Sequence, residues 1–209
     1  MLNILLADDH PVVREGIKQI VSNAYGQVAF GEVNNAKELL VKLTSARWDI
    51  VLLDLSMPGS NGVEALKRIK HEQPELPVLI LSMFPVDQYA VRTIRAGASG
   101  YLNKESAPEE LVQAIKTVLR GGEYISPAAA DELVLYARHE GDQPLHKQLS
   151  DREYQVLCGI ASGKEVKEIS SELALSPKTI STFRARLMEK MNMKTNAELT
   201  HYAIQNGLV

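Results

Sequence analysis

Apolar residues in the first 124 positions form two alternating patterns, short runs of strand length and longer stretches with helical spacing. The five predicted strands are residues 3–8, 28–33, 49–54, 78–82 and 100–103. The five predicted helices are residues 11–23, 35–46, 62–72, 86–96 and 107–120. A repeated strand–helix alternation predicts an α/β fold, a doubly wound five-stranded parallel sheet with helices on both faces.

Local helix-start signals agree with this pattern. Pro11 suits the first position of the first helix, where its missing N–H costs nothing. Asn35 with Glu38, and Ser106 with Glu109, have the spacing of capping boxes, in which each residue satisfies a backbone N–H at the other. We therefore expect helices to begin just after Asn35 and just after Ser106.

The rest of the chain is predicted to be helical, apart from a polar segment. Residues 124–138 are Ala-rich and helical in pattern, whereas residues 139–148 contain Gly and Pro without periodicity and indicate a linker. The later predicted helices are residues 150–162, 166–174, 177–191 and 196–206. The predicted organisation is a first domain at 1–124, a helical linker at 125–148 and a small all-α domain at 149–209.

Composition narrows the class of protein. Only one cysteine is present, Cys158, which excludes an intrachain disulfide framework and fits a reducing compartment. No apolar run approaches the ~20 residues that a membrane span needs, and the N-terminus lacks a secretion signal. We expect a soluble, cytoplasmic protein that makes no use of a membrane.

Charge is unevenly distributed along the chain. The 209 residues carry 23 basic and 26 acidic side chains, a net charge of −3 that by itself argues weakly against nucleic acid as a partner. Residues 149–209 nevertheless carry 8 basic and 7 acidic side chains, and residues 177–194 hold five basic residues against Glu189 alone. This predicted helix and the few residues after it therefore carry the positive charge expected of a surface that faces phosphates.

Polar side chains of the first domain gather where strands end. Asp8 and Asp9 follow the first strand, Asp54 ends the third, Ser82 ends the fourth and Lys104 follows the fifth. In a doubly wound sheet, ligands bind outside these carboxyl ends. Converging carboxylates favour a hard cation such as Mg²⁺, and a carboxylate can also act as the nucleophile in phosphoryl transfer. A lysine and a hydroxyl would then stabilise the phosphoryl oxygens.

The same residues, in this order, resemble the receiver domain of bacterial response regulators, which has a flavodoxin-like fold. The matching segments are ADDHPVVREG (7–16), DIVLLDLSMPGSNGVEAL (49–66), LSM (81–83) and GYLNK (100–104). The resemblance implies that Asp54 is the phosphoacceptor for a sensor histidine kinase. It also implies that Asp9, Asp54 and the backbone carbonyl of Ser56 bind Mg²⁺, with Asp8 assisting through water.

The resemblance also assigns roles to Lys104, Ser82 and Tyr101. Lys104 would pair with the phosphoryl oxygens, while Ser82 and Tyr101 would form the switch pair that responds to the phosphoryl group. His10 lies beside the aspartates, and we expect it to begin the first helix rather than to bind metal.

The helical tail resembles the LuxR-type four-helix DNA-binding domain. Residues 166–191 have the helix–turn–helix arrangement in which the second helix enters the major groove, and the run KTIST-x-R-x-R carries the most specific likeness. The expected DNA-binding residues are Lys178, Thr179, Ser181, Thr182, Arg184, Ala185, Arg186 and Lys190. Two residues depart from the family pattern: Glu165 replaces a Ser or Thr cap, and Phe183 replaces a His or Tyr. The last helix is expected to be core, with dimerisation as a role implied by the family.

The whole chain thus resembles a two-component response regulator of the NarL/FixJ type. The resemblance implies a homodimeric regulator of transcription that binds double-stranded DNA, and that accepts and slowly loses a phosphoryl group without being an enzyme. Two alternatives are less well supported by the sequence. A phosphatase of the aspartyl-phosphate type would need an Asp-x-Asp loop and a cap insertion, and the aspartates here are adjacent. A transcription regulator that binds a small ligand would need an aromatic-lined pocket, and the first domain has few aromatic residues without a clustered motif.

Overall fold

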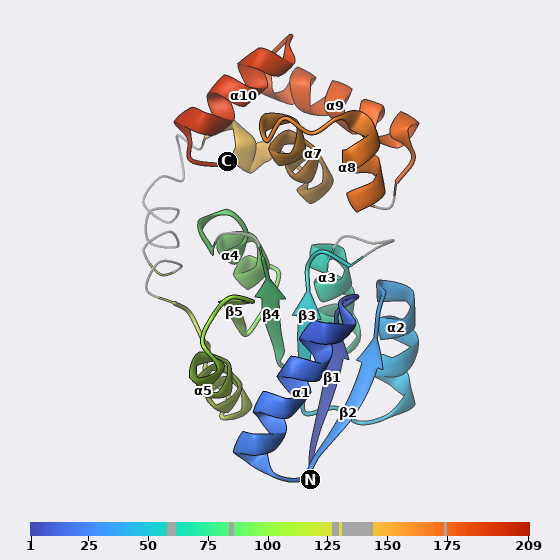
Figure 1. Cartoon of the computed structure of the whole chain (residues 1–209), viewed down its shortest axis with the longest axis vertical. Helices are drawn as coiled ribbons and strands as arrows, with labels where there is room; N and C mark the ends of the chain where they lie inside the picture. The colour runs from blue at the N-terminus through green and yellow to red at the C-terminus, as the bar shows by residue number, and fades with distance from the viewer. Residues whose placement is uncertain (58–61, 84–85, 127–129, 131–143, 174) are drawn as a thin grey trace. The chain divides into compact units, whose positions relative to one another are not determined.

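The chain forms two compact units, Met1–Leu135 and Tyr136–Val209 (Figure 1). The computed structural model describes residues 1–57, 62–83, 86–126, 130, 144–173 and 175–209. Most of the helical stretch expected at 124–138, and most of the linker expected at 125–148, lie outside the described residues. Within the described part of the chain, no helix has the length and hydrophobicity needed to cross a membrane.

The first unit is a parallel sheet with flanking helices, as the apolar pattern predicts. Its strands are β1 Leu2–Ala7, β2 Val28–Val33, β3 Ile50–Asp54, β4 Val78–Ser82 and β5 Gly100–Asn103. Its helices are α1 Pro11–Tyr25, α2 Ala36–Ser45, α3 Gly62–Glu72, α4 Val86–Arg95 and α5 Pro108–Leu119. The strand order is β2-β1-β3-β4-β5 with every pairing parallel, which confirms the flavodoxin-like, doubly wound fold.

Two apolar layers hold this sheet between its helices. On one face, Ile4 and Leu6 of β1 and their neighbours in β3 and β4 share a buried cluster with α1 and α5 (Figure 1). Because side chains alternate along a strand, Leu5, Val51 and Leu53 point to the opposite face and are also fully buried. Burial on both faces explains why the strands appear in the sequence as continuous apolar runs.

Helix starts match the sequence signals at Pro11 and Asn35 and differ at Ser106. The Asn35 side chain accepts a hydrogen bond from the Glu38 N–H (2.9 Å), so Asn35 caps α2 as expected. The capping box expected at Ser106 is wrong: the N-cap of α5 is Ala107, and no side chain caps it. Pro108 at the first helical position sets this start instead, because its fixed backbone angle already suits a helix.

In its described residues, the second unit consists of helices joined by short connections. It comprises a 3₁₀ helix η1 Leu145–Gln148, then α7 Asp151–Ala161, α8 Val166–Glu172, α9 Pro177–Met191 and α10 Asn196–Gln205. Capping boxes begin two of these helices, at Ser150 with Glu153 and at Thr195 with Glu198. The η1 turn occupies the end of the segment expected to be linker. Its buried His146 contacts the Tyr202 hydroxyl through Nδ1 at 2.9 Å, which ties η1 to α10.

Candidate functional site

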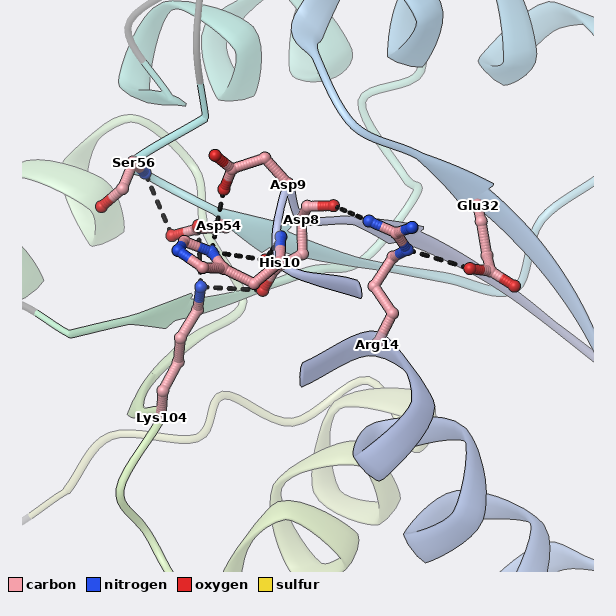
Figure 2. Close-up of polar contacts among 8 residues, drawn as sticks. All are labelled: Asp8, Asp9, His10, Arg14, Glu32, Asp54, Ser56 and Lys104. Atoms are coloured by element: carbon pink, nitrogen blue, oxygen red, sulfur yellow. Dashed lines mark hydrogen bonds and ion pairs between the residues drawn. The ribbon is translucent and has the colours of Figure 1, made fainter. Parts of the chain in front are cut away.

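The sheet topology brings the predicted polar residues to one edge. The chain leaves β1 toward β2 on one side, whereas β3, β4 and β5 extend to the other side, so the strand order reverses beside β1. Such a switch point leaves an open crevice at the carboxyl ends of the strands. Asp8 and Asp9 follow β1 at this point, and Asp54 is the last residue of the neighbouring β3 (Figure 2).

Lys104 joins two of the carboxylates. Its Nζ lies 2.7 Å from Oδ2 of Asp8 and 2.7 Å from Oδ2 of Asp54 (Figure 2). The side chains of Asp8, Asp54 and Lys104 are 4%, 0% and 5% exposed, so this ion pair is shielded from water. The Lys104 N–H also donates to the Ser82 carbonyl oxygen (2.9 Å), which fixes the lysine backbone at the end of β4.

The carboxyl group of Asp54 is held by backbone as well as by charge. The Ser56 N–H donates to its Oδ1 at 3.0 Å (Figure 2). Burial raises the pKa of Asp54, and the nearby charge of Asp8 adds to this, while the Lys104 ammonium and the Ser56 N–H oppose it. The pKa of Asp54 lies above its ordinary value of 3.8 as a result. Lys104 is therefore an important group that favours the ionised, nucleophilic form.

The donor set fits a hard divalent cation. Asp8, Asp9, His10 and Asp54 each offer one ligand atom, and these four atoms lie within 4.8 Å of one another. Among the described residues, the cluster contains three carboxylates, and the Lys104 ammonium pairs with those of Asp8 and Asp54, so lysine alone leaves excess negative charge. Carboxylate oxygens with remaining open positions are the donors that Mg²⁺ prefers, since that ion retains several waters.

His10 is closer to this cluster than the sequence suggested. It is the N-cap residue of α1, as expected, and its backbone N–H donates to Asp8 Oδ1 at 2.8 Å. Its ring Nδ1 also lies 3.1 Å from Asp8 Oδ1 and 2.9 Å from Asp9 Oδ1 (Figure 2). The immediate adjacency of His10 to Asp8-Asp9 was the only sequence signal for this contact.

Ser82 and Tyr101 lie on neighbouring strands and are completely buried. Ser82 is paired with Asn103, and Ile80 is paired with Tyr101, two residues earlier on both strands. Because residues two apart share a face of the sheet, the Ser82 and Tyr101 side chains belong to the same face. That placement is the one their predicted joint role requires.

In the second unit, α9 presents the predicted DNA-binding residues to different extents. The exposed ones are Lys178, Ser181, Thr182, Ala185, Arg186 and Lys190, while Thr179 and Arg184 are half-buried. The opposite side of α9 is buried through Ile180, Leu187 and Met191. The Ser176 side chain accepts a hydrogen bond from the Thr179 N–H (3.1 Å) and caps the helix.

Two of the basic side chains on α9 have partners within the unit, which sequence reasoning missed. Arg184 Nε donates to Oδ1 of Asn196, at the start of α10, at 2.8 Å. Lys190 Nζ lies 2.6 Å from Oε2 of Glu153, whose side chain is 4% exposed. Burial raises the pKa of Glu153, but the Lys190 ammonium and the Ser150 backbone and hydroxyl outweigh it, so this pKa lies below its ordinary value.

The two departures from the family pattern have local consequences. The backbone N–H of Glu165 donates to Glu168 Oε2 at 2.6 Å, so the Glu168 side chain caps the start of α8. Both acidic residues lie at the N-terminus of α8, where negative charge suits the helix dipole. Phe183 is half-buried on α9 and offers no polar atom to a phosphate.

Comparison with known proteins identifies the family. Residues 4–116 match the response regulator receiver domain, and residues 147–203 match the bacterial regulatory proteins of the luxR family. The chain belongs to the response-regulator family. Its combination of domains is that of a NarL/FixJ-type regulator, a two-component protein that controls transcription as a DNA-binding helix–turn–helix protein.

Relatives of this response regulator match it along nearly their full lengths. Response regulator UvrY of Escherichia coli K12 is 37% identical over 209 residues, 100% of this chain and 96% of that protein. Response regulator GacA of Pseudomonas aeruginosa is 36% identical over 211 residues, 100% of this chain and 98% of that protein. RcsB of Salmonella enterica serovar Typhimurium, solved bound to promoter rprA with a phosphomimetic, is 28% identical with a TM-score of 0.64, covering 97% of this chain and 98% of that one.

Proposed function

We propose that a sensor histidine kinase phosphorylates this response regulator on Asp54, and that the phosphorylated protein controls transcription by binding specific DNA. The observation that carries this proposal is the buried Asp54 carboxyl group, held 2.7 Å from Lys104 at the switch point of the sheet. A carboxylate paired with one fixed cation in a buried site has the environment that phosphoryl acceptance needs.

In the proposed reaction, an Asp54 oxygen attacks the phosphorus of a phosphohistidine on the kinase. An O–P bond forms on Asp54 while the P–N bond breaks, and the kinase imidazole leaves and takes up a proton. Lys104 shifts its ammonium from the carboxylates toward the new phosphoryl oxygens, and the Ser82 hydroxyl donates to one of them. Water then hydrolyses the phosphoryl group on Asp54 slowly, which returns the protein to its starting state.

Magnesium is the cation that we assign to the cluster. Asp9, Asp54 and the Ser56 carbonyl would hold it, with Asp8 acting through water, because their oxygen donors fit a hard ion. When bound, Mg²⁺ would offset the negative charge that builds up on the phosphoryl oxygens. The acidic residues by themselves would repel an incoming phosphoryl group, which is why a cation is needed here.

The output of the proposed switch is DNA binding by α9. We assign the groove and backbone contacts to Lys178, Thr179, Ser181, Thr182, Arg184, Ala185 and Arg186. Lys190 belongs to the expected set as well, but its ammonium is bound by Glu153, so we expect it to stabilise the second unit instead. Solved RcsB structures, described as bound to promoter DNA and as two dimers on two parallel DNAs, support DNA binding by a homodimer.

Phosphorylation would reach α9 through the receiver. We assign Ser82 and Tyr101 as the switch pair: the Ser82 hydroxyl moves toward the phosphoryl group, and the Tyr101 ring repacks behind it. The proposed organisation keeps residues 1–124 as receiver, 125–148 as linker and 149–209 as DNA-binding domain. A regulator of this class acts where the chromosome is, so we place it in the cytoplasm.

Labelling with a small phosphodonor tests the proposal. The full-length protein, incubated with Mg²⁺ and acetyl phosphate, is expected to gain one phosphate that is stable in acid and labile in base, as measured by intact mass. Asp54→Asn should abolish this labelling. Asp49→Asn, the same change just before the opposite end of β3, is the matched control and should be labelled like the original protein. Full labelling of Asp54→Asn would reject Asp54 as the acceptor.

A further inference from the structure

Arg14 contacts the backbone between the two adjacent aspartates. From α1, its Nη1 donates to the Asp8 carbonyl oxygen at 2.6 Å, and its Nε donates to Glu32 Oε2 at 2.9 Å (Figure 2). The Arg14 side chain is 17% exposed, so water competes little for these bonds. The guanidinium therefore connects the loop after β1 with strand β2.

The carbonyl that Arg14 binds belongs to the peptide unit joining Asp8 to Asp9. The N–H of Asp8 is held as well, by the Val33 carbonyl oxygen of β2 at 3.1 Å. Because a peptide unit is planar, fixing its carbonyl limits the directions in which both neighbouring side chains can leave the backbone. Arg14 thus acts on the orientation of Asp8 and Asp9 together without touching either carboxylate.

Glu32 gives the guanidinium a rigid support. It lies in β2 opposite Leu6 of β1, and its carboxylate also binds Lys18 of α1 at 2.7 Å. Hydrogen bonds from Lys18 and Arg14 hold the pKa of Glu32 below its ordinary value, which keeps the carboxylate ionised. Glu32 also offsets the charge of Arg14, so the aspartate cluster keeps the negative charge that attracts a cation.

We propose that Arg14 is a positioning residue for the cation site, which sets the affinity for Mg²⁺ by fixing the Asp8–Asp9 peptide unit, with Glu32 as its support. The inference rests on the proposed function only in naming the ion. A guanidinium suits this task better than an ammonium, since its donors lie in one plane and reach two acceptors in fixed directions. Groups that orient metal ligands in this way typically change metal affinity by about 10–100-fold when removed.

Magnesium binding to the full-length, unphosphorylated protein tests this directly. We expect calorimetric titration to show weaker Mg²⁺ binding by about 10–100-fold in Arg14→Met. The Mg²⁺ affinity of Arg14→Lys should lie between those of Arg14→Met and the original protein. An ammonium can bind the Asp8 carbonyl oxygen, but it lacks the planar second donor that binds Glu32. Arg47→Met is the matched control: it removes an exposed arginine of the same unit that makes none of these bonds, and its Mg²⁺ affinity should stay unchanged.

The dependence of labelling on Mg²⁺ separates positioning from general damage. With acetyl phosphate, Arg14→Met should need more Mg²⁺ for half-maximal labelling and should reach the original rate at saturating Mg²⁺. Equal affinities in Arg14→Met and the original protein would overturn the inference, as would a lower saturating rate with unchanged half-saturation. If Arg14→Met does not fold, the same two measurements on Arg14→Lys test the inference. A failure of the original protein to label on Asp54 would instead reject the proposed function.

Discussion

Lys104 Nζ lies 2.7 Å from Oδ2 of Asp54, and both side chains are almost completely buried. A second bond of 2.7 Å runs from the same ammonium to Oδ2 of Asp8. One lysine therefore bridges two buried carboxylates that would otherwise repel each other more strongly, and its single positive charge offsets one of their two negative charges. From this geometry we expect Lys104 to stabilise the resting receiver as well as to assist the proposed phosphoryl transfer.

Lys104→Met should strongly destabilise the first unit in the absence of divalent cations. Removing one partner of a buried ion pair leaves uncompensated charge, at a cost of about 3–5 kcal/mol. Urea unfolding followed by the fluorescence of Trp48, the single tryptophan and a residue of the first unit, measures this change. Added Mg²⁺ should restore part of the loss, since a ligand that binds the folded state stabilises it. Lys116→Met, on exposed α5 surface, is the control; an equal effect of both changes would contradict this prediction.

The receiver site could be predicted from the sequence because parallel strands place their carboxyl ends together. Once the alternation of strands and helices was recognised, Asp8, Asp54 and Lys104 had to lie at one edge, whatever the details of packing. The structure agrees with this placement, because Lys104 Nζ lies 2.7 Å from a carboxylate oxygen of each aspartate. Ser82 was expected at the end of the fourth strand, but its sharing a face of the sheet with Tyr101 follows only from the β4–β5 register.

Other features depend on contacts between distant residues and were not predictable. Arg14 has the sequence character of an exposed helical arginine, and its bonds depend on the β1–β2 register that brings Glu32 beside it. Lys190 and Glu153 are 37 residues apart and meet only because α9 packs on the start of α7. At Ser106, two start signals competed within three residues, and Pro108 decided the outcome because its backbone angle is fixed.

Gly62→Ala should destabilise the receiver. A Cβ at position 62 would lie 2.5 Å from the Leu55 Cα, so the start of α3 and the segment after β3 would have to separate. Overpacking of this kind typically costs about 1–3 kcal/mol. Gly16→Ala is the matched control, because nothing lies within 4 Å of its Cβ on α1, and alanine favours a helix over glycine by about 0.5–1 kcal/mol. Unfolding in urea, followed by Trp48 fluorescence, should show that Gly62→Ala lowers the free energy of unfolding and that Gly16→Ala raises it. A stabilising Gly62→Ala would show that residue 62 does not approach Leu55 closely.

Arg186→Ala should weaken DNA binding in a manner that depends on salt. Removing one basic group that binds a phosphate reduces the slope of log affinity against log salt concentration by about one unit. Arg184→Ala should do the same, and it should also free the Asn196 side chain that Arg184 now binds. Fluorescence anisotropy on one DNA duplex over a range of salt concentrations measures both slopes. Arg120→Ala, at the end of α5 in the other unit, is the control and should leave the slope unchanged. An unchanged slope in Arg186→Ala would remove that residue from the proposed DNA surface.

Lys190→Met should act on stability rather than on the salt dependence of DNA binding. Its ammonium is bound by Glu153, whose side chain is 4% exposed, and loss of a partner for a buried polar group costs about 1–3 kcal/mol. Native-state hydrogen exchange at amides of α7 and α9 measures the local loss of stability in the full chain. The anisotropy experiment on the same variant should give the original salt slope, and a slope lower by one unit would show that Lys190 contacts phosphate.

The Lys190–Glu153 pair should also set how the second unit responds to acid. The pKa of Glu153 is lower in the folded chain than its ordinary value of 4.5, so ionisation of Glu153 favours folding. This contribution is fully present above the unfolded-state pKa and is lost as the pH falls through the folded-state pKa. Amide NMR signals of α7 and α9 should therefore weaken progressively below a pH of about 4.5. In Glu153→Gln, which cannot titrate, this pH dependence should be smaller while stability near neutral pH is reduced. An unchanged acid response in Glu153→Gln would assign it to other carboxylates of the unit.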